Sequence, residues 1–185
     1  MVRQHIWNFA NTVDVEDVKS VLDRQNRYNM AIAEEGMKHD YGANIGKVLI
    51  DTYDDDVRTR AKAMAAAGSD ARMSGCELPV IINSGSGNQG IKHRECGAEK
   101  MYRALVLSNL AAIHQKTGIG RLFAYCGAVC AGAAAGAGIA YLCDGGYDEV
   151  CHTVVNALAV VWQVRYDLSD VLAFVNYFSS HTWKI

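Results

Sequence analysis

The segment Asn83-Ser84-Gly85-Ser86-Gly87-Asn88-Gln89-Gly90 has the composition of a loop that holds a small ligand. It contains no apolar side chain, so it cannot form a packed helix. Gly, Asn and Ser reach left-handed backbone conformations and can turn several amide N–H groups toward one point, where an anion binds. Because the segment directly follows the apolar run Val80-Ile81-Ile82, we predict a ligand loop. A flexible surface loop is the alternative that composition alone favours.

The glycine spacing of this loop gives little support to nucleotide binding. The phosphate-loop pattern G-x-x-x-x-G-K-[ST] fails because Lys92 follows Ile91, and no Ser or Thr comes next. Gly85, Gly87 and Gly90 match G-x-G-x-x-G, but the preceding strand is short and the acidic residue expected after a second strand is missing. A nucleotide site therefore ranks third, behind an enzyme site and a non-catalytic binding module.

Cysteines are the second group of residues that could do chemistry. The chain has six: Cys76, Cys96, Cys126, Cys130, Cys143 and Cys151. Residues 1–19 lack the apolar core of a secretory signal, so we expect a cytoplasmic protein whose thiols stay reduced. Cys126 and Cys130 are four residues apart and share one face of a helix. Burial in the core and metal binding are both open for them, and burial is expected for most of the six.

Composition predicts a mainly α fold, with a Gly/Asn/Ser-rich substrate loop and a buried Ala/Gly-rich central helix. One proline in 185 residues and many alanines favour helices over a turn-rich β-sandwich. Apolar residues make up 50% and charged residues 21%, which excludes a disordered chain. The 18 basic residues do not outnumber the 20 acidic ones, so we expect no nucleic-acid partner.

Apolar periodicity predicts helices over residues 14–38, 45–67, 99–116, 122–143 and 145–161. We expect Gly36 or Gly42 to end the first of these. The second should break at 53–56, where three consecutive aspartates favour a helix start and could alternatively bind a cation. Residues 122–143 contain no charged residue and are long enough to span a membrane, but their many Ala and Gly side chains gain little free energy on transfer into lipid. We therefore expect a buried helix, whole or in two halves, and no membrane partner.

Three separate motifs together resemble one family. They are Gly68-Ser69-Asp70-Ala71-Arg72-Met73, the loop at 83–90, and Gly118-Ile119-Gly120-Arg121-Leu122 with Cys126-Gly127. In this order they are similar to the iron–sulfur-dependent, pyridoxal-phosphate-independent lyases that include L-cysteine desulfidase and the L-serine dehydratase α-chain, on the desulfidase-like branch. The similarity covers residues 6–161. It implies breakdown of L-cysteine to pyruvate, ammonia and sulfide, or of L-serine to pyruvate and ammonia.

The resemblance also implies a cofactor and a site. In the family, three cysteines hold a [4Fe–4S] cluster whose open iron faces the substrate while a base removes the α-proton. Cys126 matches the first cluster cysteine, and Arg121 would pair with the substrate carboxylate or with the charge of the cluster. No residue is assigned as the base. The small amino-acid substrate would lie against Asn83, Ser84, Gly85, Ser86, Gly87, Asn88 and Gln89.

Two motifs of the family pattern are missing from the chain. The family motif Cys-Asp-Gly-Ala-Lys-x-Ser-Cys, which supplies the other two cluster cysteines, is replaced by the sequence of residues 162–169, and no cysteine follows Cys151. The family's N-terminal Pro-Gly-Cys-Thr-Glu-Pro-type motif is also absent. Such departures are typical of a truncated or frame-shifted gene, so we expect a partial domain over 1–161 and a divergent tail over 162–185.

These departures leave two functions open. The first is an iron–sulfur lyase that is incomplete as an enzyme and does not hold its cluster stably, because one ligand cannot hold a cluster. The second is a non-catalytic remnant, or a module that binds small carboxylates. A homo-oligomer is compatible with either function.

Overall fold

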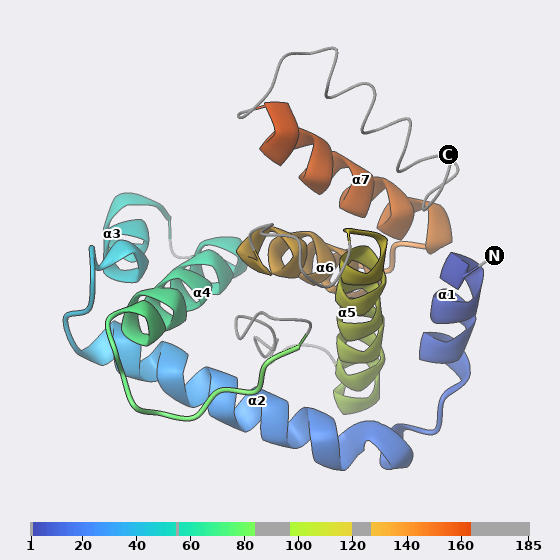
Figure 1. Ribbon diagram of the computed structural model, residues 1–185, viewed down its shortest axis with the longest axis horizontal. Helices are drawn as coiled ribbons and strands as arrows, with labels where there is room; N and C mark the ends of the chain where they lie inside the picture. The colour runs from blue at the N-terminus through green and yellow to red at the C-terminus, as the bar shows by residue number, and fades with distance from the viewer. Residues whose placement is uncertain (1, 55, 84–96, 120–126, 164–185) are drawn as a thin grey trace. The chain divides into compact units, whose positions relative to one another are not determined.

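The computed structural model describes residues 2–54, 56–83, 97–119 and 127–163. Their regular structure consists of seven helices, with no strand element among them, so the predicted mainly α class is confirmed (Figure 1). The helices are α1 (Val2–Thr12), α2 (Val15–Lys38), α3 (Ile45–Thr52), α4 (Val57–Met73), α5 (Ala98–Ile119), α6 (Gly127–Leu142) and α7 (Tyr147–Gln163).

The chain divides into two compact units. The first unit comprises residues 1–18, 83–86 and 95–185, and therefore contains α1, α5, α6 and α7. The second unit comprises residues 19–82 and 87–94, and contains most of α2 together with α3 and α4. The site residues of each unit are accordingly described within that unit.

In the first unit, α6 packs against both α5 and α7, and α1 packs against α5. Small side chains allow the close approach of α5 and α6, since a Cβ atom on Gly138 would lie 3.1 Å from the carbonyl oxygen of Ala104. Ala111, Ala112 and Ala134 form a buried cluster one to two turns further along. The predicted buried Ala/Gly-rich helix is thus confirmed over residues 127–142, and residues 122–126 lie outside the described ones.

The antiparallel arrangement of α5 and α6 is fixed at one end by Lys100. Its Nζ donates to the carbonyl oxygen of Leu142 at 2.9 Å and to Oδ1 of Asp144 at 2.7 Å. A cation is favourable there because the last carbonyl groups of a helix carry partial negative charge. The start of α5 therefore lies beside the end of α6, and the end of α5 lies toward the start of α6.

In the second unit, α2 and α4 meet through glycines. A Cβ atom on Gly36 would lie 2.1 Å from the carbonyl oxygen of Ala67, and one on Gly68 would lie 3.3 Å from the Cα of Ala33. The expectation that Gly36 or Gly42 ends the first helix was wrong, because Gly36 is a packing position inside α2, which ends at Lys38.

The Gly68–Met73 motif is the last part of α4, so the expected helix end near Ala67 was also wrong. The carboxylate Oδ2 of Asp70 accepts a hydrogen bond from the backbone N–H of Ile45 at 2.9 Å. Asn44, the N-cap residue of α3, has a left-handed backbone and makes no side-chain cap, so α4 supplies the missing acceptor. One motif of the family resemblance therefore has a structural role in this unit.

The break predicted at 53–56 is confirmed between α3 and α4. Asp56 is the N-cap of α4, and its Oδ1 accepts from the backbone N–H of Thr59 at 2.6 Å. For Asp56 the helix-start interpretation is therefore correct, whereas Asp55 lies outside the described residues.

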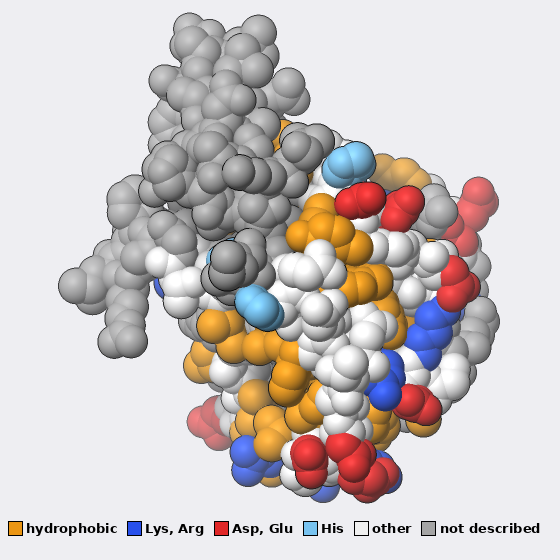
Figure 2. All heavy atoms as spheres, turned by 90° about the vertical axis from the view of Figure 1, so that its right-hand side faces the viewer, with side chains coloured by type: hydrophobic (Ala, Val, Ile, Leu, Met, Phe, Trp, Pro, Cys, Tyr) orange, Lys and Arg blue, Asp and Glu red, His pale blue; other side chains and the backbone are white. Residues whose placement is uncertain are grey.

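Some apolar side chains remain on the surface. The face shown in Figure 2 exposes a broad band of hydrophobic side chains with acidic and basic side chains at its margins. Among the described residues of the first unit, the exposed large apolar side chains are Phe9, Ile113 and Ile139. A search of the described helices finds none that is both long and apolar enough to cross a membrane.

Candidate functional site

Asn83, the first residue of the predicted ligand loop, is docked on α5 within the first unit. Its Nδ2 donates to the backbone oxygen of Asn109 at 3.2 Å and to Oδ1 of Asn109 at 3.0 Å. An asparagine amide nitrogen only donates, and both of these acceptors belong to Asn109. The start of the loop is thus held by a rigid helix through a side-chain amide.

Asn109 is a site residue that the sequence analysis missed. Its pattern gave one signal, since asparagine is a poor helix former and lies within a helix otherwise rich in Ala and Leu. The remaining predicted site residues lie outside the described part of the chain: Ser84, Gly85, Ser86, Gly87, Asn88, Gln89, Arg121 and Cys126. Asn83 is therefore the one predicted site residue whose contacts can be given.

In the second unit, Asn29 of α2 holds the extended segment that leads to the loop. Its Oδ1 accepts from the backbone N–H of Ile81 at 2.9 Å, and its Nδ2 donates to the Ile81 carbonyl oxygen at 3.2 Å. Ile82 is 58% exposed, so the interpretation of residues 80–82 as a buried run was wrong for this residue. A buried amide that pairs with the backbone, rather than apolar burial, fixes the segment.

Gln115 is a fully buried polar residue of α5, with 0% of its surface exposed. Among the described residues, neither Oε1 nor Nε2 of Gln115 has a hydrogen-bond partner. Gln115 lies one turn of α5 after Ala111 and Ala112, which belong to the buried alanine cluster. On α6, the buried Cys130 lies one turn before Ala134, the third member of that cluster. Burial of an unpaired amide costs about 1–3 kcal/mol, so Gln115 is an energetically unfavourable polar position in the core of the first unit.

The described cysteines differ in burial and lie at separate places in the fold. Cys130 and Cys151 are buried, Cys143 is exposed, and Cys76 belongs to the second unit. Cys130 and Cys143 are thirteen residues apart on α6 and its C-terminal cap, about 20 Å at 1.5 Å per residue. Within the described ranges no three His, Cys, Asp or Glu side chains gather as a metal site. These thiols therefore do not fit a cluster that requires three of them around one centre.

A polar cluster lies at the C-terminal end of α2 in the second unit. Tyr41 donates its hydroxyl to Oε1 of Glu35 at 3.3 Å, and Nδ1 of His39 lies 2.8 Å from the same oxygen. A hydrogen bond with Cys76, reinforced by burial, raises the pKa of the Tyr41 hydroxyl above its ordinary value. Tyr41 therefore remains a neutral donor at physiological pH, and the cluster fastens the residues after α2.

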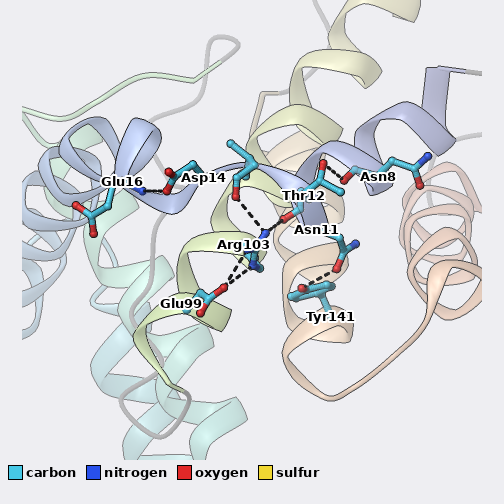
Figure 3. A network of polar contacts seen from close by, with 10 residues as sticks. Asn8, Asn11, Thr12, Asp14, Glu16, Glu99, Arg103 and Tyr141 are labelled. Carbon is cyan, nitrogen blue, oxygen red and sulfur yellow. Dashed lines mark hydrogen bonds and ion pairs between the residues drawn. The ribbon is translucent and has the colours of Figure 1, made fainter.

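The C-terminal end of α1 is fastened to α5 by Arg103 (Figure 3). Its Nη1 donates to the carbonyl oxygens of Ala10 at 3.0 Å and Val13 at 3.3 Å. Its Nε and Nη2 donate to Oε1 of Glu99 at 3.1 Å and 2.9 Å. Because the last carbonyls of a helix lack intrahelical partners, the guanidinium satisfies groups that would otherwise need water.

A small apolar cavity of about 10 Å³ lies among the first-unit helices. Trp7 packs edge-on against Tyr141 and Tyr147, with ring centroids 5.7 Å and 6.0 Å apart. The cavity has room for about one water but offers few polar partners, so it is a packing gap rather than a ligand pocket. Its lining consists of Ile6, Trp7, Leu107, Ala111, Tyr147, Val150 and Cys151.

Comparison with known proteins places this helical chain in a family. The profile of the serine dehydratase alpha chain matches residues 2–162. A UPF0597 protein of Desulfitobacterium hafniense is 63% identical over 166 residues, which cover 84% of this chain and 39% of the relative. A UPF0597 protein of Lachnoclostridium phytofermentans is 57% identical over 166 residues, covering 84% of this chain and 40% of the relative.

A UPF0597 protein of Treponema denticola is 48% identical over 171 residues, covering 84% and 40% of the two chains. The chain thus spans about 40% of the length of these curated relatives. No solved structure matches it. The chain belongs to the serine dehydratase alpha chain family, which confirms the family resemblance drawn from the three motifs.

Proposed function

We propose that this chain is the amino-acid-binding part of an iron–sulfur lyase. The reaction is the elimination of sulfide from L-cysteine, which gives pyruvate, ammonia and sulfide, or of water from L-serine, which gives pyruvate and ammonia. The match of the serine dehydratase alpha chain family to residues 2–162 carries the proposal. The cytoplasm is the proposed location, because thiols stay reduced there.

The proposed substrate site begins at Asn83, which α5 holds through Asn109. Ser84 to Gln89 would supply backbone and side-chain donors, and the Arg121 guanidinium would form a bidentate pair with the substrate carboxylate. A few such hydrogen bonds, each worth about 1 kcal/mol net, support binding of a free amino acid at about millimolar strength.

The cofactor of the proposed reaction is a [4Fe–4S] cluster, with Cys126 as one ligand. The positions of Cys130, Cys143 and Cys151 do not fit the other two ligands, because they lie at separate places along α6 and α7. We therefore assign no catalytic step through the cluster, and the proposed role of this chain by itself is substrate binding. A module that binds small carboxylates without catalysis is the second candidate, and the same scattered thiols favour it.

Two measurements test the proposal. Ligand-observed NMR should detect L-cysteine or L-serine at millimolar concentration, and Ser84→Ala and Asn88→Ala should weaken the signal without changing the helical circular dichroism. Failure of the wild-type chain to bind either amino acid would refute the substrate class.

The second measurement is iron content after anaerobic reconstitution with iron and sulfide. We expect much less than one cluster per chain, because a cubane requires about three thiolates in fixed geometry. The iron content of Cys126→Ser is compared with that of Cys130→Ser, the control, which removes a thiol four residues away in the sequence. A stoichiometric cluster that Cys126→Ser removes would overturn the assignment to binding alone and establish a complete ligand set in this chain.

A further inference from the structure

Helix α6 has the sequence of a helix that is buried on every side. Its side chains include no charged group, no amide and, apart from Tyr141, no hydroxyl group. Helices at the surface of a globular protein keep a polar face toward water, whereas a helix that is apolar all round is buried all round. In the first unit α6 packs against α5 and α7, and these two helices cover only part of its circumference (Figure 1).

The uncovered part of α6 is one continuous face. Gly132, Ala135, Gly136 and Ile139 follow the i, i+3, i+4, i+7 spacing that places residues on one side of a helix. Gly132 is exposed, Ile139 is 47% exposed, and the other two residues are half-buried. Ala134, on the opposite side of the helix, is fully buried. We call the four residues the outer face of α6.

The outer face can accept the close approach of another protein surface. A Cβ atom built on Gly132 meets no described atom within 4 Å, so the space over this residue is open. On the packed side of α6, a Cβ atom on Gly138 would lie 3.1 Å from the carbonyl oxygen of Ala104, and its absence lets α5 approach. The outer face therefore carries the same kind of apolar, small-residue surface that α6 uses to contact α5.

We propose that the outer face of α6 is covered by the part of the family protein that this chain lacks. The chain covers 39% and 40% of the Desulfitobacterium hafniense and Lachnoclostridium phytofermentans relatives, which leaves about 60% of each without a counterpart here. An apolar face that this chain leaves open is thus expected where the missing part packs. This interface goes beyond the proposed function and does not depend on the substrate.

The size of the outer face favours this occupant over a second copy of the chain. The 16 residues of α6 extend about 24 Å at 1.5 Å per residue, and a helix is about 10 Å wide. Such a strip is far smaller than the roughly 800 Å² that each partner of a stable complex buries. Two outer faces alone are therefore too small to hold two copies together, whereas a segment as long as the missing part can extend onto neighbouring surfaces.

Cys143 provides a reporter beside the outer face. Its backbone N–H donates to the carbonyl oxygen of Ile139 at 3.0 Å, so it lies one helical turn beyond this residue. The Cys143 thiol is exposed, and a partner that covers an exposed thiol slows its reaction with N-ethylmaleimide. In the isolated chain, mass spectrometry should find Cys143 alkylated at least about tenfold faster than the buried Cys130.

The first experiment supplies the missing part as a separate polypeptide. The tagged full chain is co-expressed with the Desulfitobacterium hafniense relative from which the matched region has been removed. The chain should retain this polypeptide in about equimolar amount, and alkylation of Cys143 should slow at least about tenfold. Gly132→Glu should reduce the retained amount about tenfold, because an unpaired charge is costly to bury. Asn156→Glu, at an exposed position of α7, is the control and should retain it.

A chimera provides the second measurement, which does not require the missing part to fold alone. In the chimera this chain takes the place of its matched region in the same relative. Cys143 should be protected there, and Gly132→Glu should restore its alkylation while circular dichroism shows unchanged helices. If Cys143 reacts as fast in the chimera as in the isolated chain, the proposal is wrong.

Slow alkylation of Cys143 in the isolated chain would overturn the proposal as well. Protection that increases with protein concentration would assign the outer face to a second copy. Protection that is independent of concentration would assign it to another part of this chain. None of these results depends on amino-acid binding, so the proposed function is tested separately.

Discussion

Replacement of Arg103 with methionine should release the C-terminal end of α1 from α5. Methionine keeps most of the aliphatic length but removes the donors to the carbonyl oxygens of Ala10 and Val13. Ala10 is in the last turn of α1 and Val13 directly follows the helix, so the helix supplies no partner for either carbonyl group. The loss therefore falls on α1 more than on the rest of the first unit.

The size of the effect follows from the geometry. A hydrogen bond from a charged donor is worth about 1.5–3 kcal/mol, and the 3.0 Å bond to Ala10 is the better of the two. The ion pair with Glu99 adds less than about 0.5 kcal/mol, because the Glu99 side chain is 71% exposed. We therefore expect a loss of about 2 kcal/mol for Arg103→Met, about 1 kcal/mol for Arg103→Lys, and little for Glu99→Gln.

Hydrogen exchange measured by mass spectrometry gives the assay. If the free energy of opening α1 falls by about 2 kcal/mol, the exchange rate of its amides rises about 30-fold. Peptides from α3 and α4 in the second unit provide the internal reference. Two results would refute the reasoning. One is a change of less than twofold in the exchange rate of the α1 amides for Arg103→Met. The other is an equally large change for Glu99→Gln, which would show that the ion pair with Glu99, and not the contacts with the carbonyl groups, stabilises α1.

Two further predictions concern packing and charge. Gly36→Ala should lower the free energy of unfolding in urea by about 2 kcal/mol, because its Cβ would lie 2.1 Å from the Ala67 carbonyl oxygen. Gly132→Ala, at a helical position where a Cβ meets nothing within 4 Å, should raise the free energy of unfolding by about 0.5–1 kcal/mol. If both substitutions changed the free energy of unfolding by the same amount, the close approach of Gly36 to Ala67 would be contradicted. A hydrogen bond from Lys47 and its positive charge lower the pKa of the Asp40 carboxyl below its ordinary value of 3.8. The Asp40–Lys47 pair therefore stabilises the fold at pH values above 3.8, and this stabilisation is lost as the pH falls through the lowered pKa. Lys47→Gln should raise the pKa of Asp40 toward 3.8 in an NMR titration, and an unchanged pKa would show that Lys47 is not the cause.

The sequence by itself determined the fold class, the existence of the main helices and the family. Helical periodicity and the scarcity of proline are local properties, so they can be read without knowledge of which helices touch. The three motifs were sufficient to identify the serine dehydratase alpha chain family, which the match over residues 2–162 confirmed. The predicted roles of Ser84 to Gln89, Arg121 and Cys126 rest on that resemblance and stay predictions.

Helix ends were predicted less well, for a physical reason. Gly36 and Gly68 have low helix propensity, so the local pattern placed helix ends near them, but both lie inside helices where the absence of a Cβ allows α2 and α4 to meet. Close packing between helices outweighs the propensity cost of about 1 kcal/mol for each glycine. That gain depends on the partner helix and leaves no mark on the surrounding sequence.

Only the tertiary structure decided which polar side chains hold the candidate site. Asn83 and Asn109 are 26 residues apart, and Asn29 and Ile81 are 52 apart. A single hydrogen bond over such a separation has no periodic signature, and any of several asparagines could have made it. The fold selects Asn109 because it places a helix carbonyl and a side-chain oxygen together within hydrogen-bond distance of the Asn83 amide nitrogen.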